Sequence, residues 1–101
     1  MLSVLKGMTV KEVETVNDYL TLLFNEEGDT GIHVYNNNTI NAKSPYDLME
    51  QTIQDVIETN EDLRITFSDG TRLVIGMRED DYNGPESLIY FAGGSLFFVK
   101  Q

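Results

Sequence analysis

The chain contains an internal repeat, which constrains its fold more than any other feature of the sequence. Residues 5–24 (LKGMTVKEVETVNDYLTLLF) align without gaps on residues 48–67 (LMEQTIQDVIETNEDLRITF) at a constant offset of 43. Beyond these segments the match continues at an offset of 41, because the first copy is two residues longer. Self-similarity of this kind indicates two copies of one supersecondary unit. We take the copies as residues 5–35 and 48–77.

The second half of each copy alternates apolar and polar residues with a period of two, which is typical of a half-buried strand. YLTLLF (19–24), LRITF (63–67) and RLVIGM (72–77) follow this pattern. The last two segments flank Asp69-Gly70. Asp-Gly between alternating strands predicts a tight hairpin turn with φ above zero at both positions. We therefore expect a β-hairpin in the second half of each copy.

The first half of each copy admits two interpretations. Thr9-x-x-Glu12 resembles a helix capping box, but the β-branched residues that follow favour a strand over 10–15. In the second copy Ser44-Pro45 is a good helix start, so we expect a short helical turn near 45–50 and then a strand from about 52 to 58. The alternative is a continuous helix over 45–58, which would make the fold α+β.

The remaining segments complete a mainly β architecture. NNNTINAKSP (36–45) is polar and rich in turn formers, and we interpret it as a linker between the copies. In SLIYFAGGSLFFV (87–99) two apolar runs flank Gly93-Gly94 and predict a closing hairpin, whose two apolar faces require cover or another chain. Two three-strand units and this hairpin give about eight strands. The sequence predicts one domain over 1–101, a sandwich or a partly open barrel.

Charge and composition restrict the classes of function. The chain carries 17 acidic and 7 basic residues, a formal net charge of −10. Such a field repels nucleic acid and anionic membranes and attracts basic proteins, although negative charge also serves solubility alone. There is no cysteine, which excludes disulfides and cysteine-ligated zinc. A short apolar opening and the lack of a run of about 20 apolar residues predict a cytoplasmic protein.

Features that resemble catalytic or metal sites do not meet the requirements of such sites. Residues 79–84 approach the spacing of an EF-hand calcium loop, but Tyr90 stands where a bidentate glutamate is needed. His33 is the only histidine, alternates with apolar neighbours and is expected on a strand surface. A carboxylate pair that acts as acid and base needs two different environments, and the acids at 79–81 are adjacent in the sequence, so nothing distinguishes their roles. We expect no enzyme, no cofactor and no metal.

The acidic residues gather in two places, and both are candidate partner-binding surfaces. REDDYNGPES (78–87) lies between two apolar runs and places one aromatic ring among carboxylates, which suits a partner rich in Arg and Lys. A second cluster lies around the hairpin of the second copy. The sequence does not choose between them, and a solvated turn is the alternative for each. The candidate residues are Glu79, Asp80, Asp81, Tyr82, Glu86, Asp55, Glu58, Glu61 and Asp62.

The segment FSDGTRLVIGMREDDYNGPESLIYF (67–91) resembles the closing half of a loose group of short bacterial proteins. They share a Phe-x-Asp-Gly hairpin, an acidic-Tyr-x-Gly-Pro-Glu turn, here Tyr82 to Glu86, and a final apolar hairpin. Small acidic proteins of this kind are similar to immunity proteins that neutralise secreted toxins, including those of contact-dependent growth inhibition. The resemblance implies a cytosolic, non-catalytic inhibitor that binds a basic toxin domain, often a nuclease, and blocks its active site or substrate groove.

Two further classes of function stay open. The hairpin 87–99 carries no charge inside it, and an uncovered apolar edge pairs readily with another strand. A self-assembling β module, a homodimer through this hairpin, is the first alternative. The second is a small ligand-binding barrel, which would need a pocket that holds Glu86, His33 or Tyr82 with strongly shifted pKa values.

Overall fold

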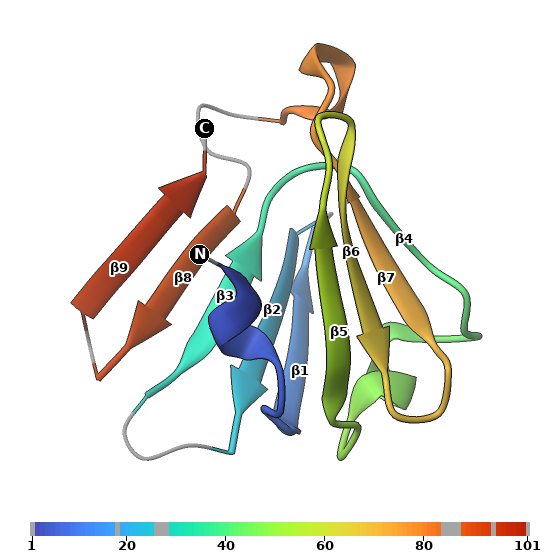
Figure 1. The fold of residues 1–101 in the computed structure, drawn as a ribbon, viewed down its shortest axis with the longest axis vertical. Helices are drawn as coiled ribbons and strands as arrows, with labels where there is room; N and C mark the ends of the chain where they lie inside the picture. The colour runs from blue at the N-terminus through green and yellow to red at the C-terminus, as the bar shows by residue number, and fades with distance from the viewer. Residues whose placement is uncertain (1, 18, 26–28, 84–87, 94, 101) are drawn as a thin grey trace.

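The computed structural model describes residues 2–17, 19–25, 29–83, 88–93 and 95–100, with the side chains of Leu2 and of residues 95–100 outside this set (Figure 1). Three short 3₁₀ helices, η1 (Leu2–Leu5), η2 (Pro45–Leu48) and η3 (Glu79–Asp81), interrupt an otherwise β structure. The described strands are β1 (Val10–Val16), β2 (Tyr19–Phe24), β3 (Gly31–Val34), β4 (Asn38–Ile40), β5 (Ile53–Glu58), β6 (Asp62–Phe67), β7 (Arg72–Gly76), β8 (Leu88–Ala92) and β9 (Ser95–Lys100).

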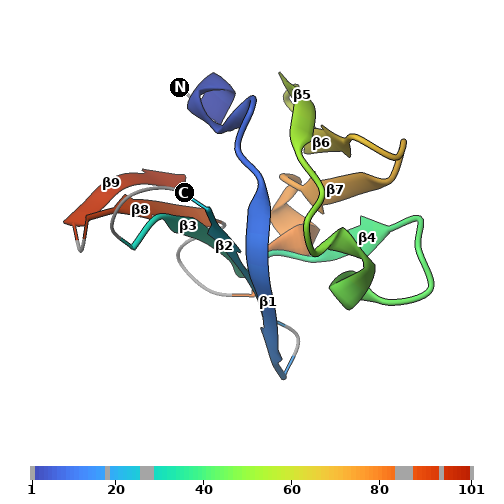
Figure 2. The same ribbon diagram turned by 90° about the horizontal axis from the view of Figure 1, so that it is seen from below.

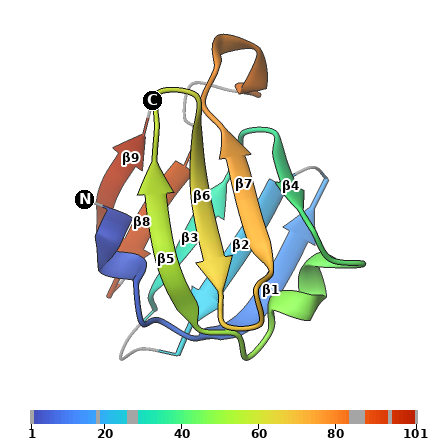
Figure 3. The same ribbon diagram turned by 45° about the vertical axis from the view of Figure 1, so that its right-hand side comes forward.

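The strands form two antiparallel sheets that pack as a sandwich. One sheet has the order β1-β2-β3-β8-β9 and the other the order β4-β7-β6-β5. Figure 2 shows the two sheets on opposite sides of the molecule, and in Figure 3 the four-stranded sheet lies in front of β1, β2 and β3. Both sheets have two open edges, so the barrel is not closed. The predicted mainly β class is confirmed.

Period-two alternation explains which side chains fill the space between the sheets. In β2 every second residue is buried, while the residues between them face outward. Fully burying a Leu, Ile or Phe side chain contributes about 1.5–3 kcal/mol each, so this core is the main source of stability. Its buried members are Leu5, Met8, Val10, Val13, Leu20, Leu22, Phe24, Ile32, Val34, Leu48, Ile53, Leu63, Ile65, Phe67, Leu73, Ile75 and Leu88.

The two copies of the repeat fold alike and meet at equivalent residues. Each copy is a 3₁₀ helix followed by a three-stranded meander, η1-β1-β2-β3 and η2-β5-β6-β7. Thr9 and Thr52, which hold the same place in the repeat, form a β-bridge, and their hydroxyl oxygens lie 2.8 Å apart. The flanking backbone hydrogen bonds are reciprocal, from Val10 N to Gln51 O and from Ile53 N to Met8 O, both at 2.8 Å. The copies are therefore related by a local two-fold axis near the threonine pair.

Backbone irregularities also recur at equivalent places. The register shifts just after Val10 in β1 and just after Ile53 in β5. Gly7 has a φ of 89°, and its counterpart Glu50 has a φ of 69°. The same turn thus uses a glycine in the first copy and a strained glutamate in the second.

Two details of the sequence prediction are wrong. The segment 36–45 is not only a linker, because Asn38–Ile40 forms β4 and pairs with β7. The hairpin around Asp69 has a three-residue loop, since Phe67 N donates to Thr71 O at 2.8 Å. Among the loop residues only Gly70 has a positive φ, of 89°, and the Asp69 carboxylate accepts the Thr71 N–H at 2.8 Å.

The ambiguous segment after residue 44 resolves as a 3₁₀ turn and a strand. Ser44 caps η2 by accepting the N–H of Tyr46, and Pro45 occupies the first helical position. The strand β5 follows from Ile53, so a continuous helix over 45–58 does not form. None of the helices formed by the described residues has the length and apolar character that crossing a membrane requires.

Candidate functional site

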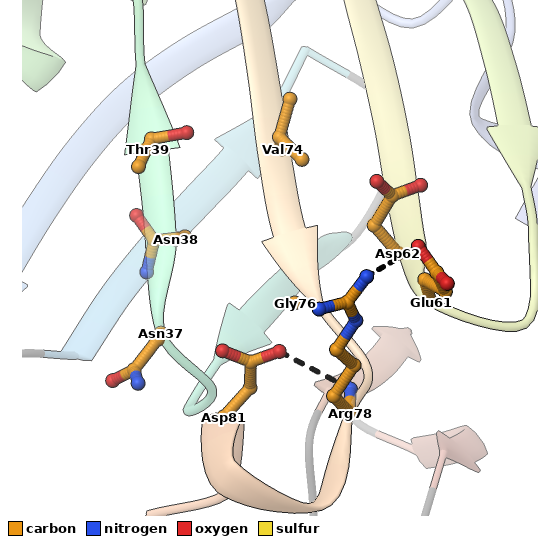
Figure 4. Close-up of a pocket in the computed structure, with 9 residues that line it drawn as sticks. All are labelled: Asn37, Asn38, Thr39, Glu61, Asp62, Val74, Gly76, Arg78 and Asp81. Atoms are coloured by element: carbon orange, nitrogen blue, oxygen red, sulfur yellow. Dashed lines mark hydrogen bonds and ion pairs between the residues drawn. The ribbon is translucent and has the colours of Figure 1, made fainter.

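The two acidic clusters of the sequence meet at one end of the four-stranded sheet. The turn between β5 and β6 lies beside η3, which follows β7 (Figure 4). The Arg78 Nη2 lies 2.6 Å from the Glu61 carboxylate, and Met77 N donates to Glu61 O at 2.8 Å. Segments that are separate in sequence thus form one surface. We call it the acidic end and define it as Glu58, Glu61, Asp62, Glu79, Asp80 and Asp81.

A hollow of about 300 Å³ opens at the acidic end. Figure 4 shows that its walls come from β4, β6, β7 and η3, and that the side chain of Arg78, the residue before η3, extends toward the β5–β6 turn. Gly76 forms part of the floor, and a Cβ there would overlap the Asp81 carboxylate. Neither His33 nor Tyr82 lines the hollow. Its residues are Asn37, Asn38, Thr39, Glu61, Asp62, Val74, Gly76, Arg78 and Asp81.

Asp81 holds η3 in place. Its carboxylate accepts the N–H of Arg78 at 3.1 Å, and its backbone carbonyl accepts the N–H of Asn37 at 2.9 Å. Asn37 in turn accepts the N–H of Gly76 at 2.8 Å. This chain of backbone contacts ties η3 to the ends of β4 and β7. Asp81 is therefore a structural member of the acidic end as well as a charged one.

Asp62 stays ionised at neutral pH. Partial desolvation raises the pKa of its carboxyl, but hydrogen bonds from Thr59 and Arg64 and the charges of Arg64 and Arg78 outweigh it, so the pKa lies below its usual range. The Arg64 Nε–Asp62 Oδ1 distance is 3.0 Å. The hydrogen bond and charge of Glu61 raise the pKa of Arg78, which keeps it protonated. The walls of the hollow thus carry fixed charges.

Glu79 and Asp80 are the freest carboxylates of the acidic end. Both side chains are exposed, and neither has a hydrogen-bond or ion-pair partner within the described part of the chain. Asp62 and Glu61, in contrast, already pair with Arg64 and Arg78. An incoming cation would therefore meet Glu79 and Asp80 first.

The other candidate residues lie elsewhere. Asp55 is next to the bulge of β5, away from the turn, with an Oδ1 4.0 Å from the Nζ of Lys6. Tyr82 follows η3 and is half-buried. Glu86 lies outside the described residues. The structure therefore brings the acids at 58–62 together with those at 79–81, and leaves Asp55 apart.

A layer of rings on the outer face of the five-stranded sheet was not predicted from the sequence. His33 faces away from the core, and its ring stacks on Phe91 with centroids 4.7 Å apart. Tyr19 and Tyr35 pack edge to face at 5.0 Å. The outward positions of YLTLLF and GIHVY signal this layer, since they hold tyrosines and a histidine where polar residues are usual.

The described residues contain no cluster of three or more His, Asp or Glu suited to a metal ion. No family model matches the chain, and neither a curated protein nor a solved structure similar to it was found.

Proposed function

We propose that this protein is a non-catalytic binding protein whose acidic end binds a basic partner protein, as an immunity protein binds its toxin. The observation that carries this proposal is the meeting of two acidic segments around one hollow, fixed by the pair Arg78–Glu61. The acidic end holds six carboxylates, and the guanidinium groups of Arg64 and Arg78 neutralise only part of that charge. Its surface potential is thus negative and attracts cations.

The charges at the acidic end suit recognition better than proton transfer. A general acid needs a raised carboxyl pKa, whereas the pKa of Asp62 is lowered. Carboxylates that stay ionised steer a cationic partner toward the surface at long range. In an immunity protein of this kind, the acidic end would occupy the groove in which a basic nuclease holds its anionic substrate.

The hollow provides a place for one long basic side chain of the partner. Asp62 and Asp81 each keep acceptor capacity, because an ionised carboxylate has about four lone-pair sites and each uses only part of them. Asn37 and Asn38 line the hollow on the side of β4, where the Asn37 side-chain oxygen accepts a hydrogen bond from Asn83 at 3.2 Å. Glu79 and Asp80 lie in η3, outside the lining of the hollow, and are exposed. Exposed charges of this kind influence the association rate more than the final affinity.

Co-purification tests this proposal. The tagged protein is co-expressed with the product of the adjacent upstream gene and isolated at low salt. We expect a basic protein to be recovered in a one-to-one ratio and released at high salt. Glu79→Lys/Asp80→Lys should lower recovery and release the partner at lower salt, because the reversed charges repel a basic protein. Both side chains are exposed, so their reversal leaves the contacts of Asp81 intact.

The matched control is Asp29→Lys/Asp47→Lys, which changes the net charge equally. These residues belong to the β2–β3 connection and to η2, neither of which contributes to the acidic end. The control should retain the partner. Equal loss in both double variants would show that only net charge matters, and recovery of no basic partner would refute the proposal.

A second candidate function is self-assembly through β9, which forms an edge of the five-stranded sheet. Ser95–Val99 carries no charge. Figures 1 and 3 show β9 to the left of β5, which is an edge strand of the other sheet. An edge strand without charges pairs readily with a second copy. This function predicts a mass that rises with concentration and returns to the monomer in Phe97→Lys. A monomeric mass at every concentration would rule it out.

A further inference from the structure

We propose that the outer face of the five-stranded sheet is a second interaction surface, which binds an arginine-bearing segment of a protein. We call it the ring face and define it as Tyr19, His33, Tyr35 and Phe91 with Leu23, Glu12 and Glu14. It lies on the other sheet from the acidic end, so the inference goes beyond the proposed function and does not depend on it.

Strand register places the members of the ring face other than Tyr19 and Tyr35 in two rows across the sheet. One row runs from Glu14 through Thr21 and His33 to Ile89. The next row runs from Glu12 through Leu23 and Gly31 to Phe91. Each row begins with a carboxylate on the edge strand β1 and has an apolar side chain on β8, beyond which the sheet continues with β9. The ring face therefore has an anionic edge and an aromatic centre.

Gly31 explains how Phe91 reaches the centre. A Cβ at Gly31 would lie 2.8 Å from Phe91 Cζ and 3.0 Å from Leu23 Cδ2, closer than a side chain tolerates. The ring of Phe91 thus lies over the bare backbone of β3, between Leu23 and His33. There it stacks on the imidazole at a centroid distance of 4.7 Å and a tilt of 25°.

A hydrogen bond fixes the imidazole in this layer. Thr21 Oγ1 and His33 Nδ1 lie 2.9 Å apart. Burial lowers the pKa of His33, while the charge of Glu14 raises it, and the net direction is below its usual value. The imidazole is therefore neutral at neutral pH and acts as a fourth aromatic ring. Tyr19 on β2, which packs edge to face on Tyr35, is 39% exposed and keeps the layer accessible.

The charges beside the rings select the occupant. Among the described side chains of β1, β2, β3 and β8, the acids are Glu12 and Glu14, and the one permanent base is Lys11 in the bulge of β1. Carboxylates and the faces of aromatic rings both attract a guanidinium group, which stacks and donates at once. Nucleic acid is repelled by these carboxylates. A neutral apolar segment would leave them without partners.

Proton NMR tests the inference, because His33 is the only histidine and its Cε1–H resonance reports on the ring face alone. The probe is an acetylated and amidated pentapeptide with two arginines, compared with the same peptide carrying lysines. We expect a saturable shift of this resonance. The arginine peptide should bind about two- to fivefold more tightly, because a planar guanidinium stacks on ring faces and is less strongly hydrated than an ammonium group.

Two variants and one control localise the binding. Tyr19→Leu removes an exposed ring and should weaken binding of the arginine peptide by a similar factor of about two to five. Glu14→Gln should weaken it and reduce its salt dependence. Glu79→Lys/Asp80→Lys at the acidic end should leave the His33 shift unchanged, so failure here is distinct from failure of the proposed function. The inference is overturned if the His33 resonance shows no saturable shift. It is also overturned if the arginine and lysine peptides bind equally well and Tyr19→Leu binds the arginine peptide as tightly as the unchanged protein does.

Discussion

The guanidinium of Arg78 lies 2.6 Å from the carboxylate of Glu61, 17 positions earlier in the chain. This pair joins η3 to the β5–β6 turn and thereby creates the acidic end. Both side chains are about two-thirds exposed, at 66% and 65%. Exposed ion pairs contribute about 0–1 kcal/mol to stability, so the value of the contact lies in geometry more than in folding energy.

Arg78→Gln should separate these two roles. We expect the free energy of unfolding, measured in urea, to change by less than about 0.5 kcal/mol, because the pair is solvated. We expect the amide resonances of Glu61 and of η3 to shift, because the side-chain contact between Arg78 and Glu61 is lost while the backbone hydrogen bond from Met77 N to Glu61 O remains. Two-dimensional NMR and urea titration check both parts, and a loss of several kcal/mol would show that the pair supports the fold itself.

Gly76→Ala should displace Asp81. The new methyl group would overlap the carboxylate that accepts the Arg78 N–H, so the variant loses about 1 kcal/mol of stability with that hydrogen bond. Asp81→Ala removes the same hydrogen bond and also makes room for the methyl group. In the double variant the two losses should therefore not add, and fully additive unfolding free energies would contradict the packing of Asp81 over Gly76.

Glu50→Gly should stabilise the protein. Glu50 has a φ of 69°, in the left-handed region that costs a non-glycine residue about 1–2 kcal/mol, and glycine adds about 0.5–1 kcal/mol of chain entropy. The net gain is about 0.5–1 kcal/mol in thermal or urea unfolding. The matched variant Gly7→Ala, at a φ of 89°, should lose about 1 kcal/mol. A loss of stability in Glu50→Gly together with a gain in Gly7→Ala would show that the turn is not strained.

Thr9 and Thr52 should be energetically coupled. Replacing either by Val leaves the other hydroxyl of this partly buried 2.8 Å pair without its partner, at a cost of about 1–3 kcal/mol. Replacing both removes the unsatisfied group and should cost less than the two single changes together. A double-mutant cycle in urea measures the coupling, and zero coupling would contradict a direct contact at the local two-fold axis.

Stability should fall as the pH drops below the range of free histidine. The pKa of His33 is lowered chiefly by burial, with Glu14 acting in the opposite direction. The unfolded chain therefore binds a proton more readily near pH 6.5, and the folded state loses stability as the pH falls through that value and through the lower folded pKa. Urea unfolding between pH 8 and pH 5 measures this loss. It should be absent in His33→Gln, and an equal loss there would assign it to other groups.

Much of the fold follows from local sequence. Strands β2, β6 and β7 alternate with a period of two because one face of each is buried, and the repeat shows which segments are equivalent. Strand β4 was not predicted, because its residues are mostly Asn and Thr and it exists through pairing with β7, a contact between distant segments. The three-residue loop at Asp69 also differs from the expected turn, because its side chain satisfies the backbone of Thr71.

The candidate site could be predicted only in parts. Each acidic cluster was recognisable as a turn, but their meeting depends on the position of η3 beside the β5–β6 turn, which no local pattern encodes. The ring face depends in the same way on the pairing of β3 with β8, which brings Phe91 to His33 across the sheet. Long-range strand order therefore decides both surfaces.

The salt dependence of association tests the role of the acidic end most directly. The association rate constant of this protein and its co-purified partner is measured by stopped flow from low to high NaCl. We predict a rate that falls by about tenfold or more as screening shortens the range of the field, and a shallower slope for Glu79→Lys/Asp80→Lys than for Asp29→Lys/Asp47→Lys. A slow rate that does not change with salt would contradict charge-steered binding by the acidic end.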